Sequence, residues 1–116
     1  MPDKSSSFAE VRFIDYDQVL ADIRRAVAEA KAARPEMIKV YLFGSLVQGN
    51  WTAASDADLI VVVHREFADV LGRGSYHISV QSIPTDTVVY SESEFEKLAQ
   101  DPSSFLAQNL PTAIEL

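Results

Sequence analysis

The segment Asp58 to Val63, an acid followed by five aliphatic residues that are mostly β-branched, limits the fold more than any other segment. Residues of this kind favour strands, so the run predicts a β-strand over 58–63. Successive side chains of a strand point to opposite faces of a sheet. One face would then carry Asp56 and Asp58 followed by Ile60 and Val62, and the other would be apolar throughout. Both faces therefore need cover from the rest of the chain.

The segments around this strand predict a mixture of helices and strands. Apolar residues at helical spacing predict a helix from Asp17 to Arg34, which Asp15 or Asp17 would cap. Ser91 followed by Glu94 has the pattern of a capping box at the start of a second helix. The other expected elements are strands over 40–43 and 86–90, a helical turn over 66–71, a short helix over 103–109 and an edge strand over 112–116, with either strand or helix over 76–83.

This order predicts an α/β (α+β) fold, a small mixed β-sheet with helices packed on one face. The chain has 116 residues, which is enough for one domain with a real core, so we expect a single domain over 1–116 with residues 1–8 flexible. The absence of cysteine excludes disulfides, thiol catalysis and thiolate metal sites. The longest apolar run has five residues, too few to cross a membrane, and we expect a cytoplasmic protein.

Acidic residues outnumber basic ones by 17 to 10, giving a net charge of −7. The whole excess falls in residues 35–116, which hold eleven acids and four bases. Such a body repels a phosphate backbone, which disfavours binding of nucleic acid, although a nucleotide that carries a magnesium ion is still compatible with it. The simpler alternative is that the acidity only favours solubility.

The residues with chemical potential are concentrated between Leu42 and Val63. Asp56 and Asp58 would project to the same side of a strand, where two carboxylates repel each other unless a cation neutralises them. Oxygen ligands suit a hard ion such as Mg²⁺, and Asp86 at the start of the 86–90 strand would supply a third carboxylate. The pattern therefore predicts a metal site built from three acids.

Gly44-Ser45 lies at the end of the 40–43 strand, and ten residues separate it from Asp56. Glycine lets a backbone come close to a ligand, and its amide and the serine hydroxyl can donate hydrogen bonds to phosphate oxygens. Each motif alone is more often a simple turn or a solvated cap. Together, a phosphate cradle and a carboxylate trio indicate metal-dependent phosphoryl chemistry.

The spacing of Gly44-Ser45 and Asp56-Ala57-Asp58 resembles the signature of the DNA polymerase β nucleotidyltransferase superfamily, and the compact chain is similar to its minimal nucleotidyltransferase branch. The similarity runs over about residues 19–115. Ser55 matches the usual serine before the first acid, and 86–91 resembles the strand of the third carboxylate. The chain departs from the pattern at Gln48, where many relatives carry arginine, and at Thr85, where they often carry an apolar residue.

The resemblance implies a palm-like fold and a Mg²⁺-dependent nucleotidyl transfer. Two Mg²⁺ ions, or Mn²⁺ in their place, would be held by Asp56, Asp58 and Asp86. Gly44 and Ser45, with Ser55, would bind a nucleoside triphosphate, expected to be ATP. A hydroxyl acceptor would attack the α-phosphate, take up AMP and release pyrophosphate.

The partner and the acceptor are open at this stage. The resemblance implies a helical HEPN-type toxin as partner, a tyrosine of that toxin as acceptor, and an antitoxin role. The alternatives are a catalytically weak binding module that neutralises or regulates a partner protein, and a nucleotide-binding sensor. Ile60 and Val62 would leave an apolar patch that self-association or a partner covers, with Trp51 near its rim, unless the chain folds its own Phe105, Leu106 and Leu110 over it.

Overall fold

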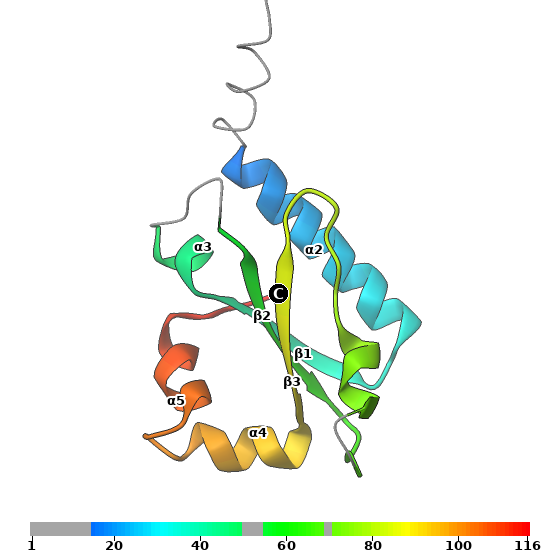
Figure 1. Ribbon diagram of the computed structural model, residues 1–116, viewed down its shortest axis with the longest axis vertical. Helices are drawn as coiled ribbons and strands as arrows, with labels where there is room; N and C mark the ends of the chain where they lie inside the picture. Colours follow the sequence, from blue (N-terminus) through cyan, green and yellow to red (C-terminus); the bar gives the residue numbers. More distant parts are fainter. Residues whose placement is uncertain (1–14, 50–54, 69–70) are drawn as a thin grey trace, which may run out of the picture.

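The computed structural model describes residues 15–49, 55–68 and 71–116 (Figure 1). Residues 1–8 and Trp51, named above, lie outside these ranges. No helix in the described part of the chain is long and apolar enough to cross a membrane. The elements are α2 (Tyr16–Ala33), β1 (Met37–Phe43), α3 (Ser45–Gln48), β2 (Ala57–Val63), η1 (Leu71–Tyr76), β3 (Thr85–Ser91), α4 (Glu92–Ala99), α5 (Phe105–Asn109), η2 (Leu110–Thr112) and β4 (Ile114–Glu115).

The four strands form one mixed sheet in the order β3-β2-β1-β4. β2 is antiparallel to β1 and parallel to β3, and the short β4 pairs antiparallel with β1 at the other edge. The three strands expected from the sequence are therefore neighbours, and the expected fold class is confirmed. β2, the most apolar strand, takes an inner position, which explains why both of its faces are apolar.

The longest helix, α2, covers the side of the sheet that faces away from the acids. Asp15 caps it by accepting from the N–H groups of Asp17 and Gln18, as the sequence predicts. Its buried residues at helical spacing pack into the same core as the apolar face of β2. That core includes Val19, Ile23, Val27, Leu59, Val61 and Val63.

The acid-bearing face of β2 is covered by α4 and α5, so helices lie on both faces of the sheet and not on one. Ile60 and Val62 are 0% and 1% exposed, packed with Leu106, Phe95 and Leu98 in a second core. The expected apolar patch is thus absent, because the chain covers it with its own C-terminal segment. Of the three residues considered as cover, Leu106 and Leu110 belong to this core, whereas Phe105 stays 47% exposed.

The segment between β2 and β3 differs from the expectation of a helical turn over 66–71. Residues 66–68 are not helical, residues 69–70 lie outside the described ranges, and a 3₁₀ helix, η1, begins at Leu71. After η1 the chain runs beside β3 (Figure 1) without joining the sheet, and an isolated bridge pairs two of its own residues, Val80 and Ile83. The ambiguous 76–83 stretch is therefore largely irregular.

A hydrogen-bonded network joins η1, β3 and α4. Ser91 and Glu94 form the predicted capping box, in which Ser91 Oγ accepts from the N–H of Glu94. Arg73 donates to both carboxylate oxygens of Glu94, at 2.8 and 2.7 Å, and to the carbonyl oxygen of Val89 at 2.8 Å. The hydrogen bonds from Arg73, with a further contribution from Ser91, lower the pKa of Glu94 to about 2.

This pKa predicts a specific loss of stability in acid. Because the folded-state pKa of Glu94 lies below its unfolded value, its contribution is complete above about pH 5 and disappears as the pH falls towards 2. Glu94→Gln should therefore cost about 1 kcal/mol at pH 6, since the side chains of Arg73 and Glu94 are 29% and 38% exposed and solvent screens the pair, and it should flatten the acid limb of the stability curve. Urea unfolding between pH 6 and pH 2.5 measures both effects. Glu96→Gln, on the same helix, is the matched control and should leave the acid limb unchanged; identical curves for the two variants would contradict the assignment.

Candidate active site

Gly44, at the end of β1, lies directly against the carboxylate of Asp58. Its backbone has φ 85° and ψ −151°, a conformation that is essentially restricted to glycine. A Cβ atom at this position would lie only 2.5 Å from Asp58 Oδ2. Glycine is therefore required at position 44 for two reasons, the backbone conformation of the turn into α3 and the close approach of the Asp58 carboxylate.

Asp58 and Asp86 are brought side by side by the parallel register of β2 and β3. They are Cα partners, so their side chains leave the same face of the sheet, on strands about 4.8 Å apart. A hydrogen bond of 2.8 Å from the N–H of Ala57 to the carbonyl oxygen of Pro84 fixes this register at the start of both strands. Asp56 lies exposed just before β2.

The three acids form a local excess of negative charge. Partial burial, and then the charges of Asp86 and Asp56, raise the pKa of Asp58 above its ordinary value. In the described ranges no lysine or arginine forms an ion pair with any of the three. This arrangement favours a bound cation, which would remove the repulsion.

The two serines named from the sequence flank the acids. Ser45 is the first residue of α3 and is half buried, and Ser55 is half buried immediately before Asp56. The hydroxyl of Tyr16, at the start of α2, donates to the carbonyl oxygen of Leu46 at 2.8 Å and so holds α3 in place. From the element bounds and the strand register, all six predicted site residues lie at the end of the sheet where β1 ends and β2 and β3 begin.

Comparison with known proteins identifies the family to which this arrangement belongs. Residues 20–110 match the family model of the nucleotidyltransferase domain. The chain belongs to this nucleotidyltransferase family. The resemblance drawn from the Gly-Ser and Asp-Ala-Asp motifs is thereby confirmed, and the match is consistent with the minimal branch of the superfamily. The family is one of transferases that act on nucleotides.

One solved structure supports the fold of this nucleotidyltransferase domain. It is a crystal structure of a Sulfolobus solfataricus protein whose assignment as a nucleotidyltransferase is provisional. The two chains are 23% identical with a TM-score of 0.56, over 71% of this chain and 75% of that one. At this identity the likeness shows the fold and no more. No curated protein matches the chain.

The chemistry of the donors fits a hard divalent cation. Among the described residues no group of three or more His, Cys, Asp or Glu side chains is arranged so that it could hold a metal ion, and this includes the trio Asp56, Asp58 and Asp86. Mg²⁺, however, is usually bound by one or two carboxylates, with water and substrate phosphates as its other ligands. Asp58 and Asp86 supply two neighbouring carboxylates on the sheet. The pKa of Asp58 is raised because its negative charge is partly buried and repelled by the other acids, and a cation would neutralise that charge.

Thr85 positions β3, the strand that carries Asp86. In the sequence it stands out only as a departure from the family pattern. Its hydroxyl donates to the carbonyl oxygen of Ile78 at 2.5 Å, and the N–H of Ile78 donates to the hydroxyl of Thr87 at 3.4 Å. These two threonines flank Asp86 on β3 and fasten the strand to the segment beside it. A hydroxyl next to Asp86 was the only sign in the sequence that Thr85 could position this strand. Its partner, Ile78, lies in the 76–83 stretch, for which the sequence allowed either strand or helix.

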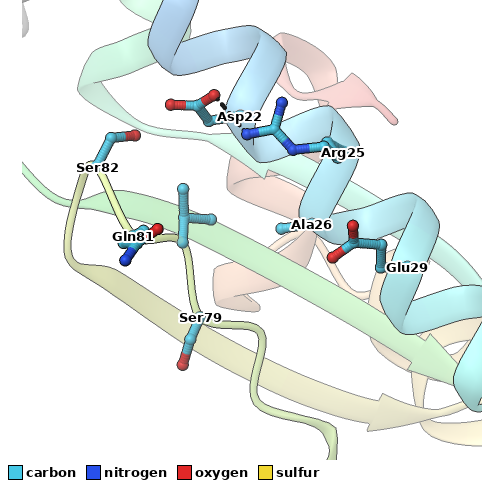
Figure 2. A pocket seen from close by; sticks show the side chains of 8 residues that line it. Asp22, Arg25, Ala26, Glu29, Ser79, Gln81 and Ser82 are labelled. Atoms are coloured by element: carbon cyan, nitrogen blue, oxygen red, sulfur yellow. Dashed lines mark hydrogen bonds and ion pairs between the residues drawn. The ribbon is translucent and has the colours of Figure 1, made fainter.

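A cleft of about 350 Å³ between α2 and residues 79–82 contains none of the predicted site residues (Figure 2). Asp22 lies on its wall and accepts hydrogen bonds from Gln18 and Arg25. The polar side chains around it, Ser82 first and then Gln18 and Arg25, lower the pKa of Asp22. Asp22 therefore stays charged beside Arg25 on this wall.

Proposed function

We propose that residues 1–116 act as a single nucleotidyltransferase domain that moves a nucleoside monophosphate, AMP from ATP, to a hydroxyl acceptor. The observation that carries the proposal is the placement of Asp58 between Gly44 and Asp86 in a chain that matches the nucleotidyltransferase family. The acceptor oxygen forms a bond to the α-phosphorus, the bond from that phosphorus to the oxygen bridging to the β-phosphate breaks, and pyrophosphate leaves. The hydroxyl proton is released to solvent.

Each site residue has a role in this proposal. Asp56, Asp58 and Asp86 would hold two Mg²⁺ ions, or Mn²⁺ in their place, and such ions would supply stabilisation of negative charge on the attacking and leaving oxygens. Gly44 and Ser45 bind the terminal phosphates, with Ser55 beside the acids. We assign Asp86 to the acceptor side, because β3 is an edge strand and this acid is exposed.

The proposed acceptor is a tyrosine hydroxyl on a separate HEPN-type protein, which this chain would inactivate as its antitoxin. The acidic body of the chain supports a protein acceptor over RNA, since residues 35–116 hold eleven acids against four bases. The alternative is a binding module with weak catalysis. Gln48 favours it, because this exposed, neutral residue at the end of α3 stands where many relatives carry an arginine.

Transfer of a labelled nucleotide tests the proposal. The purified protein is incubated with each of the four α-labelled nucleoside triphosphates and Mg²⁺, with and without the protein encoded beside it. We expect label from ATP to appear on that protein, one pyrophosphate to be released per transfer, and EDTA to abolish both. A stable complex of the two proteins with no transfer from any nucleotide would contradict the enzyme and support the binding module.

A further inference from the structure

Phe105 is an exposed aromatic residue in a region that is otherwise well packed. It is 47% exposed, and the other large apolar residue with high exposure in the described ranges is Ile38, at 38%. Its ring meets the ring of Phe43 edge-on, with centroids 5.4 Å apart and an interplanar angle of 80°. The next residue, Leu106, is fully buried and provides the core contact of α5. Phe105 therefore packs against Phe43 and still leaves about half of its surface open to solvent.

The strand register places the partner ring of Phe105 next to the acids. Asp86 is the Cα partner of Asp58 on one side, and Phe43 is its partner on the other. Directly opposed residues share a face of the sheet, so Asp86, Asp58 and Phe43 form a row across three strands. Phe105 packs on Phe43, the residue of this row that lies directly beside Asp58, with 5.4 Å between the ring centroids.

We propose that Phe105 is the stacking platform for the base of the nucleoside triphosphate, with Phe43 as its support. This inference rests on the proposed function, which puts the phosphates at Gly44 and the acids. From there the ribose and base extend along the row to the aromatic pair. An aromatic ring stacks on any base, because every base has a π-face, so the platform contributes affinity with little choice among bases.

The test separates the base from the phosphates. Binding of ATP and of inorganic tripolyphosphate, each with Mg²⁺, is measured by calorimetry on the full chain. Phe105→Ala should weaken ATP binding by about tenfold or more and leave tripolyphosphate binding unchanged. Phe105→Tyr keeps the aromatic face and should retain the affinity for ATP. Ile38→Ala, the matched removal of an exposed apolar side chain, should change neither ligand.

The outcomes distinguish a failure of the Phe105 platform from a failure of the proposed nucleotidyl transfer. If the wild-type chain binds both ligands and Phe105→Ala binds ATP as tightly as the wild type, the platform is wrong and the phosphate site stands. An equal loss of both ligands in Phe105→Ala would also overturn the platform, because tripolyphosphate has no base to stack. If the wild-type chain binds neither ligand, the proposed function fails and the platform with it.

Discussion

Asp58→Asn should lower nucleotidyl transfer by about 10²–10³-fold or more while leaving the fold intact. Asp58 occupies the middle of the site, with Gly44 against its carboxylate and Asp86 beside it in register. An amide keeps the shape of the side chain but removes the charge that would hold a cation, and loss of one electrostatic group in an active site has effects of this size. Initial rates of pyrophosphate release measure the change. A residual activity above about one tenth would contradict the role of Asp58.

The same substitution should stabilise the protein in the absence of metal. Folding raises the pKa of Asp58, so its ionised form is less favourable in the folded state than in the unfolded chain. Ionised Asp58 therefore lowers the free energy of unfolding by its full amount above the raised folded-state pKa. This loss disappears as the pH falls towards the pKa of Asp58 in the unfolded chain. Melting curves in EDTA should show a higher Tm for Asp58→Asn at pH 7, and a smaller difference at pH 4. A lower Tm at pH 7 would show that the carboxylate stabilises the fold instead.

Gly44→Ala is expected to damage both stability and activity. The backbone at this position is almost exclusive to glycine, which by itself costs about 1–3 kcal/mol for another residue. The added Cβ would also lie 2.5 Å from Asp58 Oδ2, so either the turn or the carboxylate must move. Urea unfolding measures the first effect, and transfer assays at saturating Mg²⁺ measure the second. We expect transfer to fall by at least about tenfold, in line with the cost of a small displacement at a reacting centre.

Gly49→Ala is the matched control, because it tests backbone strain without the contact to the acid. Gly49 also has φ 85°, but nothing lies within 4 Å of the Cβ that would be added. The variant should lose about 1–2 kcal/mol of stability and keep its activity. If Gly49→Ala lost as much activity as Gly44→Ala, the effect at Gly44 would be one of general strain, and its close approach to Asp58 would have no special role.

The strands and the acid cluster were predictable because their signals are local. The run 58–63 could only be a buried strand, and Asp56 and Asp58 share its face by simple alternation. Ser91 and Glu94 fixed the start of α4 through a capping box that lies within four residues. The sequence predicted that the strands of Asp58 and Asp86 are neighbours, and the structure adds that they run parallel with these two acids in register.

The side of the sheet that each helix covers could not be predicted, because it depends on contacts distant in the chain. α4 was expected with α2, but Phe95 stacks on Tyr41 with ring centroids 5.8 Å apart, which places the helix on the acid-bearing face. The positioning role of Thr85 and the role proposed for Phe105 were not predicted, for the same reason. Their partners, Ile78 and Phe43, are identified by the tertiary structure alone.

The most direct measurement is the position of a bound metal. Crystals grown with Mn²⁺ and an ATP analogue that cannot be cleaved at the α-phosphate would show manganese by its anomalous scattering. We predict manganese in contact with the carboxylates of Asp58 and Asp86, with the phosphates of the analogue beside Gly44 and Ser45. Manganese bound elsewhere, for instance at the acidic residues near the start of α4, with no peak between Asp58 and Asp86, would contradict it.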